Sequence, residues 1–190
     1  MSYFPSYLQL EEKRILLVGG GAIALEKLEK IVDFTDSVNI IAKESTDEFK
    51  LFAQRYGIDI EHRAYSRGDI DGYDIVIVAT DTQELHREIY EESRSSRILV
   101  NSVDNTKYCD FIFPSYIKRG DLTISVSTSG SSPAMAKRVR LYLEGLIPSN
   151  IGEFLSKMRE LRSTMPKGKE RMRYFEQISD EYMQENFQQK

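Results

Sequence analysis

The chain has 190 residues, of which 41% are apolar and 29% are charged, a composition typical of a soluble globular domain with a small accessory part. The net charge of −4 argues against nucleic acid as the main partner, and the single cysteine, Cys109, excludes an internal disulfide. No apolar run approaches the ~18 residues of a membrane span, no signal peptide is visible, and no metal-ligand cluster of standard spacing can be written. We therefore expect a cytoplasmic protein without a metal.

The first half of the chain alternates strand and helix patterns. Arg14–Val18 is a continuous apolar run that meets three glycines, as expected of a buried parallel strand, and Ala22–Phe34 has apolar residues at helical spacing. Ser37–Ala42 completes a βαβ unit. The alternation continues with a helix over Thr46–Arg55, strands over Ile58–Arg63 and Asp74–Ala79, a helix over Asp81–Ser93 and a strand over Arg97–Asn101. This order predicts an α/β fold with a Rossmann-like, doubly wound parallel sheet.

The pattern changes after Asp104. Two β-rich runs, Phe111–Ile117 and Leu122–Thr128, are joined by Lys118-Arg119-Gly120-Asp121, which predicts a hairpin. Three helices are expected beyond it, from Pro133 to about Ile147, over Ile151–Arg162 and over Glu170–Gln184. We expect the Rossmann-like part to end near residue 112 and a smaller α+β part to follow.

The three glycines carry the first chemical signal. Gly19-x-Gly21-x-x-Ala24, with Gly20 between the first two, matches the pattern that binds the pyrophosphate of a dinucleotide between a strand and a helix. Gly19 permits the tight turn, Gly21 lets the backbone approach the pyrophosphate, and Ala24 allows close packing of helix against strand. The helix N-terminus adds free N–H groups and a partial positive charge. A dinucleotide site is predicted, with a structural turn as the alternative.

Polar residues follow other strands at the same edge of the sheet. Glu44 is the candidate for the acidic residue that bonds the ribose, although it can equally be the first-turn acid of the next helix. Lys43 beside it suits a 2′-phosphate, so the choice between NAD and NADP stays open. Thr80 and Asp81 end the fourth strand, where they either contact the ligand or cap the following helix.

A further polar group follows the fifth strand in Asn101-Ser102-Val103-Asp104. The carboxylate of Asp104 can move a proton or orient a substrate nitrogen, and the alternative is a plain turn residue. His62 lies in an irregular polar stretch and His86 on the helix after Asp81, so we expect both at the surface. The absence of a Tyr-x-x-x-Lys pair and of a P-loop disfavours short-chain dehydrogenase and P-loop NTPase chemistry.

The loop Ser127–Ser132 precedes a helix and can bind an anionic group as the first loop binds phosphate. Lys137, Arg138 and Arg140 follow it. Together with Glu144 they give the segment 131–148 a net charge of +2 within an acidic chain. An anionic ligand and a solvated helix face both explain this reversal of charge.

Three stretches together resemble one known family. They are FPSYLQLEEKRILLVGGGAIALEK, VIVATD and ILVNSVDNTKYCDFIFPSYIKRGDLTISVSTSGSSPAMAKRVR. From about Phe4 to Pro148 the chain is similar to the precorrin-2 dehydrogenases, a family that also forms the N-terminal module of multifunctional sirohaem synthases. The resemblance implies NAD-dependent oxidation of precorrin-2 to sirohydrochlorin on the way to sirohaem.

The resemblance also implies an architecture. It predicts an NAD-binding Rossmann-like domain over 1–112, a dimerisation domain over 113–148 and a C-terminal helical domain over 149–190. It implies a homodimer whose segments after the Rossmann-like domain intertwine, with the active cleft between the cofactor and dimerisation domains.

The family's functional residues map onto matching positions of this chain. Its catalytic aspartate falls on Asp104, and its NAD contacts, with the glycines, fall on Ala22, Ile23, Lys43, Glu44 and Thr80, next to Asp81. Precorrin-2 bears many carboxylates, and the residues that we expect to contact it are Asn101, Ser127, Thr128, Ser129, Gly130, Lys137, Arg138 and Arg140.

The chain departs from the family at Ala22, where an acidic residue is common, at Lys43, where proline is common, and at His86, where asparagine is common. Two alternatives remain: a bifunctional enzyme that also inserts iron into sirohydrochlorin, and a dinucleotide-sensing module without catalysis.

Overall fold

The computed structural model describes residues 3–103 and 105–187. The chain divides into two compact units, Tyr3–Ile112 and the part from Phe113 onward. Each unit is built around its own sheet, five-stranded in the first and two-stranded in the second. A separate C-terminal helical domain over 149–190 stays a prediction.

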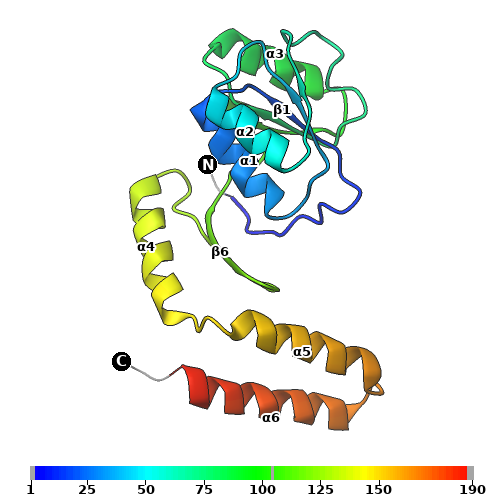
Figure 1. Ribbon diagram of the computed structural model, residues 1–190, viewed down its shortest axis with the longest axis vertical. Coiled ribbons are helices and arrows are strands. Elements are labelled where there is room, and N and C mark those ends of the chain that lie inside the picture. Colours follow the sequence, from blue (N-terminus) through cyan, green and yellow to red (C-terminus); the bar gives the residue numbers. More distant parts are fainter. Residues whose placement is uncertain (1–2, 104, 188–190) are drawn as a thin grey trace. The chain divides into compact units, whose positions relative to one another are not determined.

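The first unit is a parallel sheet in the order β3-β2-β1-β4-β5 (Figure 1). Its strands are β1 (Ile15–Val18), β2 (Val38–Ile41), β3 (Ile60–Glu61), β4 (Ile75–Val78) and β5 (Leu99–Ser102). The chain moves outward from β1 in one direction to β2 and β3, and β4 and β5 lie on the other side. This doubly wound order confirms the α/β fold expected from the sequence.

Helices connect the strands of the first unit. They are α1 (Ala22–Val32), α2 (Asp47–Arg55) and α3 (Gln83–Ser93), with a short 3-10 helix η1 (Thr106–Tyr108) after β5. The crossovers β1–α1–β2 and β4–α3–β5 run in opposite directions across the sheet. Since parallel crossovers are right-handed, α1 and α3 cover opposite faces. The expected start of α3 at Asp81 is wrong, because Thr82 is the N-cap and the helix begins at Gln83.

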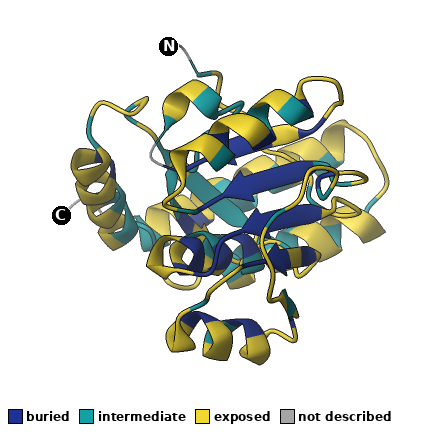
Figure 2. Cartoon of the chain, turned by 90° about the horizontal axis from the view of Figure 1, so that it is seen from above, coloured by how far each residue is buried: buried dark blue, intermediate teal, exposed yellow. Residues whose placement is uncertain are grey.

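The core lies on both sides of the central strands, which are buried along their whole length (Figure 2). On one face Leu16 pairs in register with Val76, and Val76 pairs with Val100. These side chains pack in a cluster that includes Ile89 of α3. Because both faces of β1 and β4 are covered, their sequences are continuously apolar rather than alternating.

The second unit begins with an antiparallel hairpin of β6 (Ser115–Arg119) and β7 (Leu122–Val126). Its turn is Gly120-Asp121, two residues shorter than the expected connection, and Gly120 has a φ of +59° that favours glycine. Three helices follow: α4 (Pro133–Leu146), α5 (Ile151–Thr164) and α6 (Lys169–Asn186). Pro133 occupies the first helical position, as predicted.

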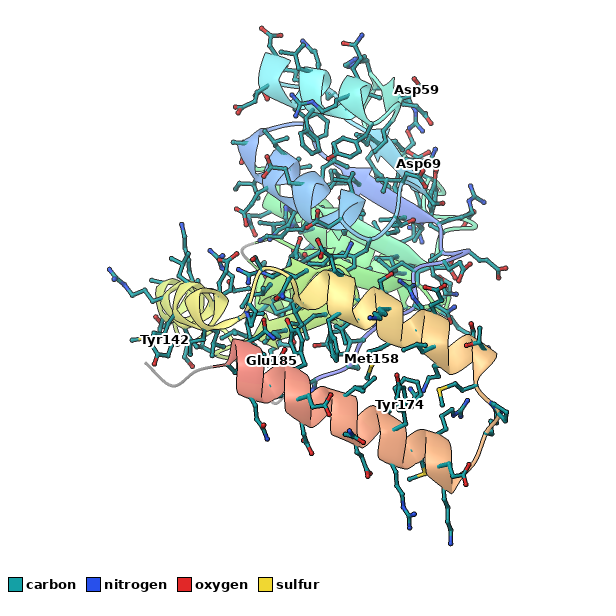
Figure 3. All side chains as sticks on the ribbon, turned by 60° about the horizontal axis from the view of Figure 1, so that its bottom comes forward. Asp59, Asp69, Tyr142, Met158, Tyr174 and Glu185 are labelled. Carbon is teal, nitrogen blue, oxygen red and sulfur yellow. The ribbon has the colours of Figure 1, made fainter. Side chains whose placement is uncertain are left out.

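The helices α5 and α6 lie side by side and antiparallel (Figures 1 and 3). Phe154 of α5 stacks on Tyr182 of α6 with ring centroids 4.0 Å apart. The hydroxyl of Tyr182 donates to Asn150 Oδ1 at 2.8 Å, which ties α6 to the residue that precedes α5.

Candidate functional site

The glycine turn lies at the carboxyl end of β1, where the strand order reverses between β1 and β4. Gly19 has a φ of +129°, and a Cβ added there would lie 2.1 Å from the carbonyl oxygen of Ala79, at the end of β4. Any side chain at Gly19 would therefore collide with backbone. Ligands of doubly wound sheets bind at such a reversal, outside the carboxyl ends of the strands.

The second glycine brings the loop after β2 to the same place. A Cβ on Gly20 would lie 2.6 Å from the carbonyl oxygen of Glu44 and 2.7 Å from Cβ of Ser45. The N–H of Thr46 donates to the Gly20 carbonyl at 3.0 Å. Lys43 and Glu44, both exposed, therefore lie beside the glycine turn, as the prediction for the ribose end of the cofactor requires.

The third glycine stands at the open side of the turn. Gly21 is the N-cap of α1 and has an ordinary φ of −86°, and a Cβ added there would meet nothing within 4 Å. Ala22 and Ile23 in the first turn are exposed, and that turn has no acidic side chain. The positive end of α1, with its unpaired N–H groups, is therefore available to an anion.

Packing behind the turn agrees with the motif. Ala24, in the first turn of α1, is fully buried, so the helix approaches the sheet closely at that position. The three glycines, Ala22, Ile23, Lys43, Glu44, Thr80 and Asp81 come from the ends of β1, β2 and β4 and gather at one edge of the sheet. The geometry suits a dinucleotide whose pyrophosphate rests on α1.

The end of β4 differs from what the sequence led us to expect. His86 is fully buried, so its predicted surface location is wrong. Its Nε2 lies 2.8 Å from the Thr80 carbonyl oxygen, and its Nδ1 lies 2.5 Å from Oγ of Ser102. Helical spacing is the sequence signal that could have predicted this burial, because His86 shares the buried face of α3 with Ile89 and Ser93.

The segment after β5 is held by side-chain bonds. The buried amide of Asn101 donates to the carbonyl of Phe111 at 2.8 Å, so this side chain is used within the protein. The thiol of Cys109 donates to the Ser102 carbonyl at 3.0 Å and accepts from the Ser102 N–H at 3.2 Å. Burial raises the pKa of the Cys109 thiol, which keeps it protonated as a donor. The predicted catalytic residue Asp104 lies outside the described residues.

An ion pair anchors the far end of the same segment. Asp110 accepts from Nη1 and Nη2 of Arg94 on the C-cap of α3, at 2.8 and 2.5 Å. The same carboxylate accepts from the N–H of Val100 in β5 at 2.8 Å. One carboxylate thus connects the C-terminal end of α3, strand β5 and the segment that follows β5.

The predicted anion loop belongs to the second unit, between β7 and α4. The Thr128 hydroxyl accepts from the N–H of Ser132 at 3.1 Å and donates to its carbonyl at 3.0 Å. Oγ of Ser127 accepts from the N–H of Ser129 at 3.1 Å. Ser129 and Gly130 have positive φ values of 51° and 85°, so the loop turns sharply here. The hydroxyl groups of Ser127 and Thr128 are thus used in hydrogen bonds within the loop.

The basic residues of α4 are not equivalent. Lys137 and Arg138 are exposed on the helix. Arg140 is half-buried and forms an ion pair with Glu144 one turn further on. The local excess of positive charge therefore rests on Lys137 and Arg138, because the charge of Arg140 is balanced within the helix.

Two kinds of feature are absent from residues 3–103 and 105–187. No helix there is both long and apolar enough to cross a membrane. No three His, Cys, Asp or Glu side chains of these residues are grouped as metal ligands.

The chain is similar to known proteins along most of its length. A siroheme synthase of Pseudoalteromonas translucida is 33% identical over 175 residues, which cover 92% of this chain and 36% of that protein. One of Methylococcus capsulatus is 33% identical over 180 residues, which cover 93% of this chain and 38% of that protein. The chain thus spans little more than a third of these relatives. A solved precorrin-2 dehydrogenase has the same fold, with a TM-score of 0.79 at 22% identity over 95% of this chain and 91% of its own.

Two family models match successive parts of the chain. One described as putative NAD(P)-binding matches residues 6–115, which hold the whole glycine turn and the five-stranded sheet. A second, described as sirohaem biosynthesis protein central, matches residues 119–145, from the hairpin into α4. The resemblance found in the sequence is confirmed at the level of the family: the chain belongs to the putative NAD(P)-binding family and continues into a region that matches the sirohaem biosynthesis model.

Proposed function

We propose that this protein is an NAD-dependent dehydrogenase that oxidises precorrin-2 to sirohydrochlorin in sirohaem biosynthesis. The observation that carries the proposal is the glycine turn between β1 and β4, with Gly19 closed against Ala79 and Gly21 open at the N-terminus of α1. Its location in a chain that continues into a sirohaem biosynthesis region favours a tetrapyrrole over other dehydrogenase substrates.

The residues present fit a nicotinamide dinucleotide. The backbone of Gly19, Gly20 and Gly21, with Ala22 and Ile23, would hold the pyrophosphate on the positive end of α1. Glu44 would bond the ribose hydroxyls and repel a 2′-phosphate, so we propose NAD rather than NADP. Lys43, Thr80 and Asp81 complete the proposed cofactor contacts.

NAD, when bound, accepts a hydride. In the proposed reaction precorrin-2 gives up that hydride, which is a proton with two electrons, and a second proton leaves the ring. Asp104 is proposed to take this proton, so the products are sirohydrochlorin, NADH and a proton that Asp104 passes to water. The roles of the chain are therefore to hold the cofactor, orient the ring and receive one proton.

The proposed substrate contacts are partly in the second unit. Lys137 and Arg138 are the exposed cations suited to the carboxylates of a tetrapyrrole. Ser127, Thr128, Ser129 and Gly130 of the loop, with Asn101 and Arg140, are proposed as further contacts. We also propose that the protein acts as a homodimer in the cytoplasm.

The reaction is tested with the purified chain, precorrin-2 and NAD, by following the appearance of NADH. Asp104→Asn should bind NAD normally and lower kcat by at least about 100-fold, because general acid–base groups contribute on that order. Asp59→Asn, an exposed aspartate away from the turn, is the matched control and should leave kcat unchanged. A folded wild-type protein that forms no NADH would overturn the proposal.

Cofactor and substrate binding are tested separately. Gly21→Asp should abolish NAD binding in a titration, because its charge would occupy the pyrophosphate position. Replacing Lys137 and Arg138 by alanine should weaken tetrapyrrole binding and leave NAD binding intact. If NAD binds while the alanine variant keeps its tetrapyrrole affinity, a dinucleotide-sensing module becomes the better description.

A further inference from the structure

The strongest unassigned feature is a buried imidazole beside the proposed cofactor site. His86 of α3 is fully buried and lies between the ends of β4 and β5. Its Nε2 is 2.8 Å from the carbonyl oxygen of Thr80 and 3.3 Å from the Thr80 hydroxyl. Its Nδ1 is 2.5 Å from Oγ of Ser102. One side chain thus contacts both strand ends.

The location of this bridge matters because the regular pairing of β4 and β5 stops there. The register ends with Val78 opposite Ser102, and the N–H of Val103 donates to the Val78 carbonyl at 2.9 Å. Thr80 lies two residues beyond Val78, where the chain has left the strand. The imidazole therefore replaces a backbone ladder in holding Thr80 at the edge of the sheet.

The hydrogen-bond partners define the tautomer of the neutral ring. A carbonyl oxygen only accepts, so Nε2 carries the proton that is donated to Thr80. Nδ1 then accepts from the hydroxyl of Ser102. Both nitrogens of the neutral ring are then satisfied, and removal of the ring would leave the carbonyl of the half-buried Thr80 and the hydroxyl of the buried Ser102 without this partner.

We propose that His86 is a positioning residue of the dinucleotide site, which acts through Thr80 on cofactor affinity and through Ser102 on the segment that leads to Asp104. This inference rests on the proposed function, because Thr80 and Asp104 are proposed there to contact cofactor and substrate. His86 does not itself reach the ligand, since no part of it is exposed. Its two nitrogens serve two different parts of the site.

Replacing His86 by an amide side chain removes one of its two hydrogen bonds and keeps the other. The amide of glutamine reaches the position of Nε2, and that of asparagine reaches the position of Nδ1. His86→Gln should retain the bond to Thr80 and a near-normal Kd for NAD, while kcat falls. His86→Asn should retain the bond to Ser102 and kcat, while the Kd and KM for NAD rise about tenfold, the equivalent of one hydrogen bond. Ser102→Ala should behave as His86→Gln.

The measurements are NAD titration, steady-state kinetics and thermal unfolding of each variant. His62→Gln, at an exposed histidine of the same unit, is the control and should match the wild type in all three. If Gln and Asn variants lose affinity and kcat in equal proportion, or neither changes, the positioning role is wrong and His86 is a packing residue. His86→Phe, which drops both bonds, should show both defects where it folds, and the Ser102→Ala variant decides where it does not.

Failure of the proposed reaction can be distinguished from failure of the positioning role of His86. If the wild type binds NAD but forms no NADH from precorrin-2, the reaction is wrong, whereas the Kd of the Gln and Asn variants still tests the link to Thr80. If the wild type binds no dinucleotide, the proposed function fails and the positioning role falls with it.

Discussion

Two glycines that stand two residues apart have separate tasks. Gly19 combines a φ of +129° with a carbonyl oxygen 2.1 Å from any added Cβ, so the fold itself requires glycine. Gly21 has an ordinary φ and open space, so the fold tolerates a side chain there, and only the proposed dinucleotide would exclude it. The motif therefore combines a structural requirement at Gly19 with a proposed binding requirement at Gly21.

The different surroundings of Gly19 and Gly21 predict different effects on stability and on NAD binding when alanine adds one methyl group at each. Gly19→Ala should lower the free energy of unfolding by roughly 2–4 kcal/mol, because it adds a backbone collision to a left-handed conformation. Gly21→Ala should cost less than about 1 kcal/mol and yet weaken NAD binding about tenfold. Urea unfolding and NAD titration measure the two quantities. Equal effects of both variants on stability would contradict this division.

The ion pair of Asp69 makes the stability of the first unit depend on pH. The carboxylate of Asp69 accepts from both Nη atoms of Arg63, at 2.6 and 3.1 Å, and from the Ser66 N–H at 2.7 Å. Arg63 in particular holds the pKa of Asp69 below its usual value. A lowered pKa in the folded state means that the bond stabilises the fold above the ordinary aspartate pKa of about 3.9 and stops doing so once the pH falls through the folded-state value.

Asp69→Asn should therefore lower stability by about 1 kcal/mol at neutral pH, and its difference from the wild type should vanish in acid. Thermal unfolding between neutral and acidic pH measures this difference. The control is Asp59→Asn, at an exposed aspartate of the same unit that Figure 3 labels together with Asp69. A difference that persists in acid would show that Asp69 acts through packing rather than charge.

At the scale of elements, Arg119 joins the hairpin to the end of α4. Its guanidinium donates to the carbonyl oxygens of Ile147 and of Glu144, the latter at 3.0 Å. Carbonyls in the last turn of a helix have no partner within the helix, and a cation there also suits the helix dipole. Arg119 therefore caps α4 from the end of β6.

Arg119→Ala should destabilise the protein by about 1–2 kcal/mol, since it leaves half-buried carbonyls without donors. Arg159→Ala provides the matched arginine, because the pair of Arg159 with Asp121 at 2.9 Å is exposed and should contribute less than about 0.5 kcal/mol. Urea unfolding compares the two variants. A smaller loss for Arg119 than for Arg159 would show that the C-terminus of α4 does not depend on this cap.

Elements were predictable from the sequence to different degrees. Continuous apolar runs located β1 and β4, and Pro133 located the start of α4, because each signal is local. The start of α3 was predicted too early, because Thr80 and Asp81 are residue types that commonly cap helices. In the structure Thr80 instead bonds His86 through its carbonyl oxygen, a contact that the sequence does not reveal. The three-residue η1 has no periodicity by which to recognise it.

At the scale of the whole molecule, α4 presents an apolar stripe. Met135, Val139, Tyr142 and Leu146 recur at helical spacing and are all exposed, Tyr142 by 69% (Figure 3). Such a face on a helix favours association with another protein surface. All of these residues but Leu146 lie in the region matched by the sirohaem biosynthesis model, which is consistent with the predicted homodimer.

Sedimentation or light scattering should therefore find a dimer of the wild type and a monomer of Tyr142→Glu, because a buried charge in the stripe costs several kcal/mol of association energy. Leu51→Glu, at an exposed leucine of α2, should leave the dimer intact. A wild-type monomer, or a dimer that tolerates glutamate at Tyr142, would exclude this stripe as the dimer contact.

The sequence alone determined the class of fold, the place of the glycine turn and the family. These follow from local properties: apolar strands of a parallel sheet are continuous, and glycines are needed where backbone or ligand approaches closely. Only the tertiary structure decided that Gly20 packs on Ser45 and that His86 lies buried between Thr80 and Ser102. The reason is that those contacts join segments brought together by the strand order β3-β2-β1-β4-β5, which no local pattern records.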